Sequence, residues 1–182
     1  MTAQQSDEQL LSDFVAGRSA ALGALAERYE RPLLGLAAGL LGGRRDLACD
    51  AVQETWLRVI RFGKQFMGAS SFKTWVYRIA VNQCRTLLPA RASPEAAVAG
   101  DKPGAAASPA EAAVNADENH AVRRAVERLD ADRRYIVLLC YHAGLTHEQA
   151  AEILEIPLGT VKSRLHAALS ELRAGLTAEV TP

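Results

Sequence analysis

Apolar residues recur every three to four positions along most of the chain, a pattern that predicts a series of amphipathic helices. The first predicted helix is short and ends at Gly17. A longer helical run covers residues 20–41, and Pro32 inside it is expected to kink or divide the helix. The glycine pair at 42–43 stops that run, so a new helix must begin beyond it.

Two further helices are predicted in the N-terminal half. The first covers residues 46–62, where apolar side chains, Ile60 among them, fall near one face. A loop with two glycines, residues 63–69, separates it from a helix over residues 72–88. One of the serines at 70–71 is expected to cap the start of that second helix, because a serine hydroxyl can accept a hydrogen bond from the free N–H groups in the helix's first turn.

The C-terminal third contains a predicted pair of helices with a tight turn. Thr146 and Gln149 have the spacing of a capping box, which predicts a helix from His147. Pro157 and Gly159 are expected to break it before a second helix follows. The inner side of the second helix should be apolar, through Val161, Leu165, Ala168, Leu169 and Leu172. Its outer side is small, polar and basic, through Thr160, Lys162, Ser163, Arg164, His166, Ser170 and Arg173.

This pair matches the plan of a helix-turn-helix, in which the second helix enters the major groove of DNA. An ordinary helical hairpin with a solvated outer face is the alternative. The distribution of charge favours DNA, because donors crowd residues 160–164 and no acidic residue follows until Glu171. Helix N-termini usually attract Asp or Glu. Their absence suggests that a phosphate takes that place.

The helix over residues 72–88 carries a second polar face. Its members lie opposite or beside the apolar residues: Thr74, Arg78, Asn82 and Arg85, with Lys73 and Tyr77 next to them. A cationic, amide-bearing face beside a tyrosine can follow a phosphate backbone and stack a base. A solvated surface is the alternative interpretation. Phe72 and Trp75 are expected in the core rather than in base stacking.

The formal net charge is zero, with 21 Lys and Arg against 21 Asp and Glu, so the chain as a whole is not a basic nucleic-acid-binding protein. The charge is uneven, with a net +3 over residues 1–90 and a net −3 over residues 91–118. Binding to nucleic acid must therefore depend on local faces. The hydrophobic content of 49% is sufficient for packed cores.

The composition changes in the middle of the chain. Residues 89–118 are rich in Ala, Pro, Gly and acidic residues and cannot bury enough apolar surface to offset the entropy of ordering, which predicts a flexible linker. The chain is thus expected to be all-α, with two small helical domains, residues 1–88 and 119–182. The second domain contains the helix-turn-helix, under which helices at 120–129 and 132–142 should pack.

Cys49, Cys84 and Cys140 lie far apart and form no CxxC pair, so we interpret them as buried structural thiols in a reducing cytoplasm, with redox sensing as the alternative. The four histidines form no metal or triad pattern, and no phosphate-binding glycine loop is present. The sequence predicts no enzyme, no catalytic residue, no metal site and no cofactor. No signal peptide is expected, and the longest apolar stretch, residues 33–41, is too short to span a membrane.

Three stretches resemble the bacterial extracytoplasmic-function (ECF) sigma factors: DAVQETWLRVIRF, FMGASSFKTWVYRIAVN and LTHEQAAEILEIPLGTVKSRLHAALSELR. These small sigma factors keep only the second and fourth conserved regions, and the resemblance covers both predicted domains. The FxGxSxFxTWxYRIAxN run over residues 66–82 is the more discriminating motif. The GTVKSRL stretch alone is weaker, because LuxR-type regulators share a similar recognition helix.

The resemblance implies roles for the domain over residues 1–88. Region two of the family binds the β′ subunit of core RNA polymerase through one helix, represented here by Asp50, Gln53, Glu54, Trp56 and Arg58. The next loop, residues 66–71, and the helix after it would read the melted minus-ten element. The residues implied on that helix are Lys73, Tyr77, Arg78 and Asn82.

Region four, residues 119–182, would read the duplex minus-thirty-five element. The residues implied are Thr160, Lys162, Ser163, Arg164 and His166. The acidic linker would run near the RNA exit path, where its charge is compatible with mimicking nucleic acid. The resemblance implies a cytoplasmic sigma factor that binds the β′ and β subunits of core polymerase and promoter DNA, and that is held by an anti-sigma factor, without membrane insertion.

The chain departs from the family's pattern in two places. Ala167 stands where the family usually has Arg, which removes one contact with phosphate or base, and Gln83 and Cys84 stand where an Asp commonly precedes an Arg. Two rival functions remain: a LuxR-like helix-turn-helix regulator that acts without polymerase, and a helical adaptor whose polar faces bind protein. Neither domain is basic enough to bind DNA strongly alone, so we expect promoter binding to depend on docking to polymerase.

Overall fold

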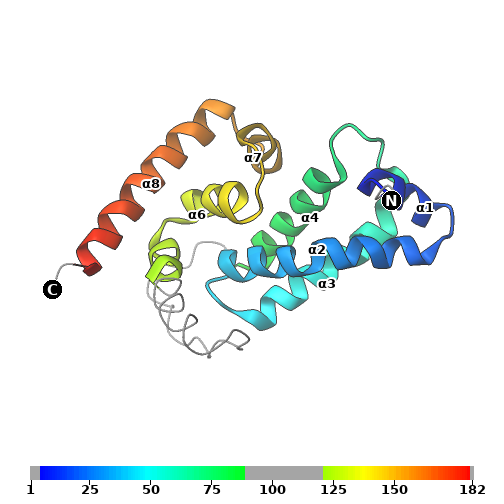
Figure 1. Ribbon diagram of the computed structural model, residues 1–182, viewed down its shortest axis with the longest axis horizontal. Coiled ribbons are helices and arrows are strands. Elements are labelled where there is room, and N and C mark those ends of the chain that lie inside the picture. Colours follow the sequence, from blue (N-terminus) through cyan, green and yellow to red (C-terminus); the bar gives the residue numbers. More distant parts are fainter. Residues whose placement is uncertain (1–4, 89–120, 181–182) are drawn as a thin grey trace.

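The computed structural model describes residues 5–88 and 121–180, and every regular element in these two ranges is a helix. Figure 1 shows two groups of helices side by side, one from each range. We call them the N-terminal unit and the C-terminal unit. The arrangement confirms the predicted all-α fold with two helical parts, whereas the predicted linker lies outside the described residues.

The N-terminal unit begins with α1 (Asp7–Val15) and α2 (Ser19–Leu40). Ser6 and Gln9 form a capping box at the start of α1, in which each side chain accepts from the other residue's backbone N–H. Pro32 lies inside α2, and the helix runs through it without a division. One missing N–H is tolerated there because α2 packs along most of its length against the core.

Gly42 and Gly43 separate α2 from α3 (Arg45–Phe62), as predicted. Both have a positive φ, +66° and +82°, which glycine adopts without steric cost. A single 3-10 turn, η1 (Gly63–Gln65), and a short loop then lead to α4 (Phe72–Leu87). α3 and α4 carry the N-terminal unit's candidate binding residues.

Two side chains satisfy the start of α4. The Ser71 hydroxyl accepts from the N–H of Thr74 at 3.1 Å, so Ser71 is the cap among the two predicted serines. The carboxylate of Glu8, on α1, accepts from the N–H of Phe72 at 3.0 Å. α4 has no acidic residue in its own first turn. α1 therefore supplies the negative charge that a helix N-terminus favours.

The C-terminal unit is helical over residues 121–128 and continues with α6 (Ala131–Val137), η2 (Leu138–His142), α7 (His147–Leu154) and α8 (Leu158–Val180). η2 is a short π-helix that continues α6 directly. The sequence predicts one α-helix over residues 132–142. In the structure, the wider π-helix η2 takes the place of its last part.

α7 and α8 form the predicted helix-turn-helix. α7 begins at His147 behind the capping box of Thr146 and Gln149, as predicted. The turn itself differs from the prediction, because Gly159 lies inside α8. The left-handed residue that ends α7 is Glu155, with φ 58°. Its N–H bonds back into α7, which holds a conformation that residues other than glycine rarely adopt.

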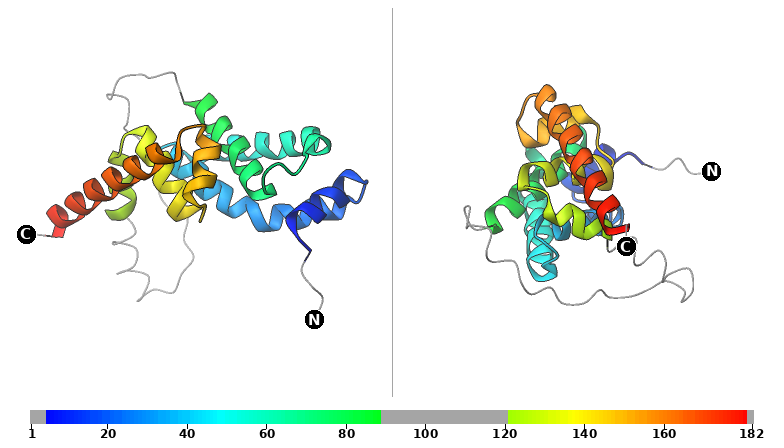
Figure 2. Two further views of the ribbon diagram at one scale, coloured as in Figure 1. Left: turned by 90° about the horizontal axis from the view of Figure 1, so that it is seen from above. Right: turned by 90° about the vertical axis from the view of Figure 1, so that its left-hand side faces the viewer.

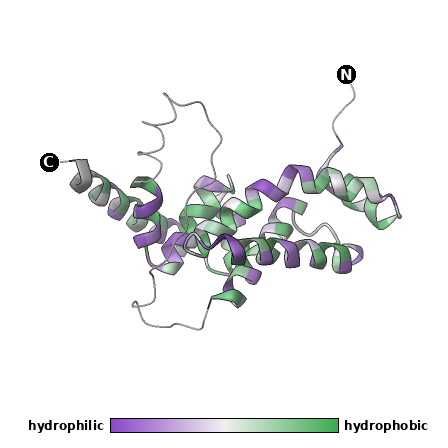
Figure 3. Ribbon diagram, turned by 90° about the horizontal axis from the view of Figure 1, so that it is seen from below, coloured by the Kyte–Doolittle hydropathy of each residue, from purple (hydrophilic) through white to green (hydrophobic). Residues whose placement is uncertain are grey.

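One hydrophobic cluster runs through both units. Leu36 on α2 and Leu139 on η2 both belong to it and are fully buried. In the N-terminal unit the rings of Tyr29 and Phe72 pack edge to face, with 5.4 Å between their centroids. Figure 3 shows hydrophobic and hydrophilic stretches alternating along the helices, as amphipathic helices require.

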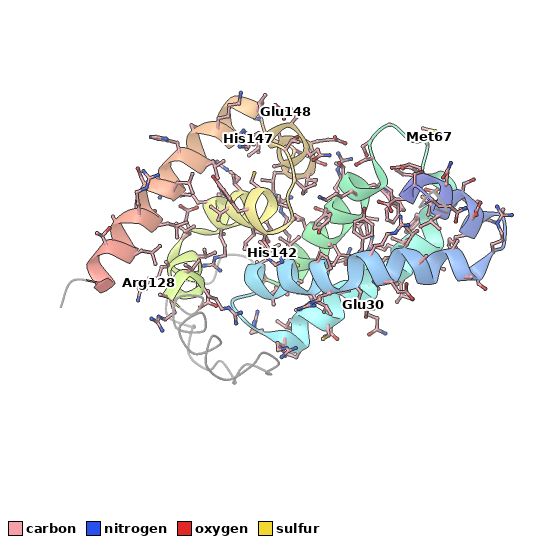
Figure 4. All side chains as sticks on the ribbon, in the orientation of Figure 1. Glu30, Met67, Arg128, His142, His147 and Glu148 are labelled. Carbon is pink, nitrogen blue, oxygen red and sulfur yellow. The ribbon has the colours of Figure 1, made fainter. Side chains whose placement is uncertain are left out.

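Two glycines allow α2 and η2 to lie close together. A Cβ atom added at Gly39 would lie 2.9 Å from Cδ1 of Leu138, and one added at Gly35 would lie 2.5 Å from Nε2 of His142. Both separations are shorter than van der Waals contact, so any side chain at either position would force a shift. Figure 2 shows the two units in contact from two further directions, and Figure 4 shows His142 beside α2.

Among the residues that the structure describes, no helix is long and apolar enough to cross a membrane. Within the same ranges, no group of His, Cys, Asp and Glu side chains could hold a metal ion. All three cysteines are free. Cys84 is buried and Cys140 is half-buried, whereas Cys49 is exposed on the polar side of α3, so its interpretation as a buried thiol is wrong.

Candidate nucleic-acid interface

The first three turns of α8 present the five residues that the sequence predicts to read duplex DNA. The inner side of these turns is buried, as predicted, through Val161, Leu165 and Ala168. The five predicted residues lie away from this core, three of them exposed and the last two half-buried: Lys162, Ser163, His166, Thr160 and Arg164. We call these five residues the recognition face. Because its inner side is packed, the face is held on a rigid helix.

Two carboxylates lie beside the recognition face. Asp132, in the first turn of α6, pairs with the guanidinium of Arg164 at 2.9 Å. Glu148, in the first turn of α7, lies near Lys162. The pKa of Glu148 is below its ordinary value, because its own backbone N–H and the Thr146 hydroxyl donate to it and because Lys162 is cationic. Figure 4 shows Glu148 at the end of the molecule where α7 meets α8.

The polar face of α4 lies partly against the C-terminal unit. We call Lys73, Arg78, Asn82 and Arg85 the α4 face. The ammonium of Lys73 donates to the Gly144 carbonyl at 3.1 Å. Nη2 of Arg78 donates to the Glu152 carboxylate at 2.8 Å and to the Glu152 carbonyl at 3.2 Å. Asn82 remains exposed. The guanidinium carbon of Arg85 lies 5.3 Å from the ring centroid of Tyr135. The structure thus brings the predicted cations together, and all three already have a partner in the C-terminal unit.

Tyr77 and Thr74 do not lie on that polar face. The side chain of Tyr77 is 2% exposed, and its ring meets that of Tyr29 edge to face with 6.4 Å between centroids. Burial raises the pKa of Tyr77 to about 12. Thr74 is buried beside the capping Ser71. The predicted exposure of both residues is wrong, because Tyr77 packs against Tyr29 of α2 and Thr74 lies against the residue that caps α4.

The residues that the resemblance assigns to polymerase binding lie along α3. Asp50 and Gln53 are exposed, and Glu54 is half-buried. Nε of Arg58 pairs with the Glu54 carboxylate at 3.1 Å, one helical turn away. Trp56 packs against the hydrophobic cluster, and its indole N–H has no hydrogen-bond partner in the described part of the chain. Trp56 therefore braces α3 from inside, while the other four form its outer surface.

A shallow groove between α3 and α4 adjoins this outer surface. The residues lining it are Asp50, Gln53, Glu54, Leu57, Gln83, Thr86 and Leu87. Leu57 is 51% exposed and Ile60 is 48% exposed. The predicted burial of Ile60 is wrong, and the exposure of Leu57 was not predicted. The sequence did contain a signal for this exposure, because Leu57 and Ile60 follow Gln53 at helical spacing on the same stripe of α3.

The loop before α4 carries one large apolar side chain in solvent. Met67 is 92% exposed, and Figure 4 shows it projecting from this loop. The loop is anchored on both sides, by the ring of Phe66 against Trp75 at 5.3 Å and by the helix cap at Ser71. Gly68, with φ +69°, makes the sharp turn beside Met67. A fixed loop thus holds an apolar tip away from the protein.

Comparisons with known proteins identify the class to which these units belong. Residues 25–93 match the family model for sigma-70 region 2, and residues 119–172 match the one for sigma-70 region 4. The RNA polymerase sigma-H factor of Pseudomonas aeruginosa is 31% identical over 179 residues, with 92% of each chain covered. The ECF RNA polymerase sigma-E factor of Haemophilus influenzae is 32% identical over 179 residues, covering 92% of this chain and 94% of the relative.

Two solved structures share the fold. CnrH, solved in complex with the cytosolic domain of CnrY, has a TM-score of 0.73 at 24% identity, covering 96% of this chain and 99% of that one. The sigma factor RpoE of Bartonella quintana, solved with the anti-sigma factor NepR, has a TM-score of 0.60 at 22% identity, covering 91% and 97%. At these identities the likeness supports the arrangement of helices alone.

The two region matches occur in the order of the two units, and the full-length relatives cover nearly the whole chain. The chain therefore belongs to the sigma-70 family of RNA polymerase sigma factors. Within that family it is a sigma factor of the ECF type, with regions 2 and 4. It acts with RNA polymerase in transcription initiation, and a LuxR-like regulator independent of polymerase is not favoured.

Proposed function

We propose that the two units divide promoter recognition between them. Residues 1–88 dock on core polymerase and read the melted minus-ten element, residues 119–182 read the duplex minus-thirty-five element, and residues 89–118 join the two. The observation that carries this proposal is that each unit matches one sigma-70 region and presents a polar helix face on a packed apolar base. The protein works in the cytoplasm and catalyses no reaction of its own.

The recognition face suits the major groove. Lys162 and Arg164 supply cationic donors of the kind that bind the O6 and N7 acceptors of guanine. The Ser163 hydroxyl donates to the Thr160 carbonyl at 3.1 Å, which leaves its oxygen free to accept from a base amino group. α8 has no acidic residue in its first turn, so its free N–H groups can bind a phosphate. His166 lies one turn further along α8, where it would lie beside the DNA backbone.

The α4 face and the preceding loop suit a single strand. Lys73, Arg78 and Asn82 offer cations and an amide for phosphates and base edges. Met67 offers an apolar surface against which an unstacked base can lie. Tyr77 contributes indirectly. Its ring is buried, so it holds α4 in place and does not stack on a base. Strand opening requires groups of both kinds, because extruded bases lose stacking and must regain contacts.

The outer surface of α3 suits a protein partner. Asp50, Gln53, Glu54 and Arg58 form a polar border, and Leu57 adds apolar area inside the adjoining groove. Protein interfaces combine an apolar centre with a polar rim in this way. We assign this surface to the β′ subunit of core polymerase, with the β subunit contacting the remainder of the protein. Docking there fixes both units near one promoter and raises their effective concentration.

An anti-sigma factor is a further proposed partner. CnrH was solved with the cytosolic domain of CnrY and RpoE with the anti-sigma factor NepR. Both have the same fold as this chain, which supports extending the partnership to it. Such a factor would act by covering the surfaces assigned above.

Reconstituted transcription tests the proposal. The purified full chain is added to core polymerase on a library of promoters, and run-off transcripts are sequenced. We expect stoichiometric association with the core enzyme and initiation at promoters that share two elements. Initiation that is identical with and without the protein would contradict the proposal. Tight binding of the free protein to those promoters at physiological salt would contradict the requirement for docking.

A further inference from the structure

Helix α1 contacts both ends of the segment that carries the loop proposed to read the melted strand. We call residues 66–71 the minus-ten loop. Before it, a Cβ atom added at Gly63 of η1 would lie 3.3 Å from Cδ1 of Leu11 on α1. After it, the carboxylate of Glu8 accepts from the N–H of Phe72, the first residue of α4, at 3.0 Å. Figure 1 shows α1 and this loop at the same end of the N-terminal unit.

α1 is itself held firmly enough to act as a support. Leu10 and Leu11 are 4% and 2% exposed and belong to the hydrophobic cluster. Asp7, in the first turn of α1, accepts from the guanidinium of Arg28 on α2 at 2.6 Å. The hydroxyl of Tyr29, also on α2, donates to the same carboxylate. Apolar burial and paired polar groups thus fix α1 on α2.

Phe72 links the contact from α1 to the minus-ten loop. Its ring centroid lies 6.0 Å from that of Trp75, and the ring centroid of Trp75 lies 5.3 Å from that of Phe66, the first residue of the loop. The N–H of Phe72 is held by Glu8, and the residue before it, Ser71, ends the loop as the cap of α4. Both ends of the loop therefore depend on where Phe72 lies.

We propose that α1 is a clamp that sets the position of the minus-ten loop, and that Glu8 is a positioning residue for reading the melted strand. The inference rests on the proposed function, because it takes this loop as part of the site for that strand. Glu8 acts through Phe72 and touches no base. Met67, in the loop, is 92% exposed, so contacts of its own side chain cannot fix its direction. The two ends of the loop must do so, and α1 holds both.

The charges of the clamp suit a position beside nucleic acid. Glu8 is opposed by the positive end of the α4 dipole, since α4 has no acidic residue in its own first turn. Asp7 is opposed by Arg28. Both carboxylates are thus balanced by positive charge, which limits their repulsion of a nearby strand. Glu8 also occupies the start of α4, where a phosphate could otherwise bind, so the strand is directed to the polar side of that helix.

Tryptophan fluorescence tests the clamp without polymerase. Trp56→Phe leaves Trp75 as the single tryptophan of the chain. In that background, we expect Glu8→Ala to increase the quenching of Trp75 by acrylamide, because a displaced loop withdraws Phe66 from the indole ring. Glu30→Ala, at an exposed position on α2, is the matched control and should leave the quenching unchanged. Equal quenching in the Glu8→Ala and Glu30→Ala proteins would overturn the proposal.

Transcription with core polymerase tests the effect on base reading. Each position of both promoter elements is varied in turn, and initiation is compared. We expect Glu8→Ala to lower discrimination among bases of the minus-ten element about two- to five-fold, the range set by one charge at a helix N-terminus. Discrimination in the minus-thirty-five element should stay the same. Val52→Ala removes buried apolar atoms in the first half of α3 and destabilises the unit through a different helix, so it should preserve discrimination in both elements.

The two experiments separate failure of this inference from failure of the proposed function. If the unchanged chain fails to support initiation by core polymerase, the proposed function is wrong, whatever Trp75 reports. If it initiates but Glu8→Ala reads the minus-ten element normally, or loses discrimination in both elements alike, the protein is a sigma factor whose loop does not depend on α1. Greater quenching of Trp75, together with a loss confined to the minus-ten element, establishes the clamp.

Discussion

The guanidinium of Arg164 on α8 is paired with the carboxylate of Asp132 on α6 at 2.9 Å. The two side chains are 38% and 62% exposed, so the pair lies at the surface. The most versatile donor of the recognition face is thus held by the helix that supports it. If α8 enters the major groove as proposed, Arg164 must either leave Asp132 or bring the Asp132 carboxylate close to the DNA.

Asp132→Asn is therefore expected to strengthen binding to the minus-thirty-five element. Breaking the Arg164–Asp132 pair and bringing the Asp132 carboxylate close to the DNA are both electrostatically unfavourable. The neutral amide of Asn reduces either cost. We expect a gain of about 0.2–1 kcal/mol, the range for an exposed ion pair. The measurement is the affinity of the reconstituted polymerase complex for promoter DNA, with Glu30→Gln, at an exposed position on α2 of the N-terminal unit, as the control. Weaker binding by Asp132→Asn would instead mean that the carboxylate orients Arg164 for its base.

Arg164→Ala and Lys162→Ala are expected to weaken recognition of the upstream element. Each should cost roughly 1–3 kcal/mol if it contacts a base, and the loss should be confined to particular base positions. Arg173→Ala, further along the exposed side of the same helix, is the matched control. The measurement is transcription across promoters mutated one position at a time. Normal initiation by both variants on a promoter that needs its upstream element would exclude this role for α8.

Tyr77→Ala is expected to destabilise the N-terminal unit rather than to affect DNA alone. Removing a buried aromatic ring costs about 3–5 kcal/mol of unfolding free energy. Tyr77→Phe keeps the ring and should unfold and open promoters like the unchanged protein. Chemical unfolding and permanganate probing of the melted strand check the two outcomes. Normal stability with selective loss of strand opening in Tyr77→Ala would show that the ring does reach a base.

Glu8→Gln is expected to weaken the start of α4. The carboxylate accepts from the Phe72 N–H and opposes the positive end of the helix dipole. Loss of the charge should lower the unfolding free energy by about 0.3–1 kcal/mol at low salt, and by less at high salt. Urea unfolding at two salt concentrations measures it. Glu30→Gln, at an exposed position on α2, is the control and should show neither effect.

The three cysteines are expected to differ in reactivity. Burial raises the pKa of Cys84 to about 12, so at pH 8 it remains a thiol and does not attack a disulfide reagent. Burial also raises the pKa of Cys140. Cys49 is exposed and should react first. Titration with a chromogenic disulfide reagent should show one fast thiol in the folded protein and three after unfolding. Fast reaction in a Cys49→Ser variant would contradict this order.

Local features were predictable from the sequence because local interactions determine them. The capping box at Thr146 fixes where α7 begins, and the spacing of apolar residues fixes which side of α8 is buried. The recognition face follows directly from that spacing. The position of these residues away from the core was therefore predictable without knowledge of any tertiary contact.

Features that depend on a distant partner were not predictable. Glu8 reaches α4 across 64 positions, and Arg78 finds Glu152 across 74. No periodicity in either segment signals such a contact. Helical spacing placed Tyr77 beside the polar face, but the space next to Tyr29 decided where its ring lies. Tertiary packing thus overrode the local pattern where the two disagreed.

The glycines of α2 at positions 35 and 39 limit which residues the chain can carry where its two units meet. A single methyl group added at Gly39 or Gly35 would lie too close to Leu138 or His142, and α2 and η2 would have to move apart. Neither glycine belongs to the recognition face or to the α4 face. A substitution there can therefore alter the fit between the units without changing any residue proposed to read DNA.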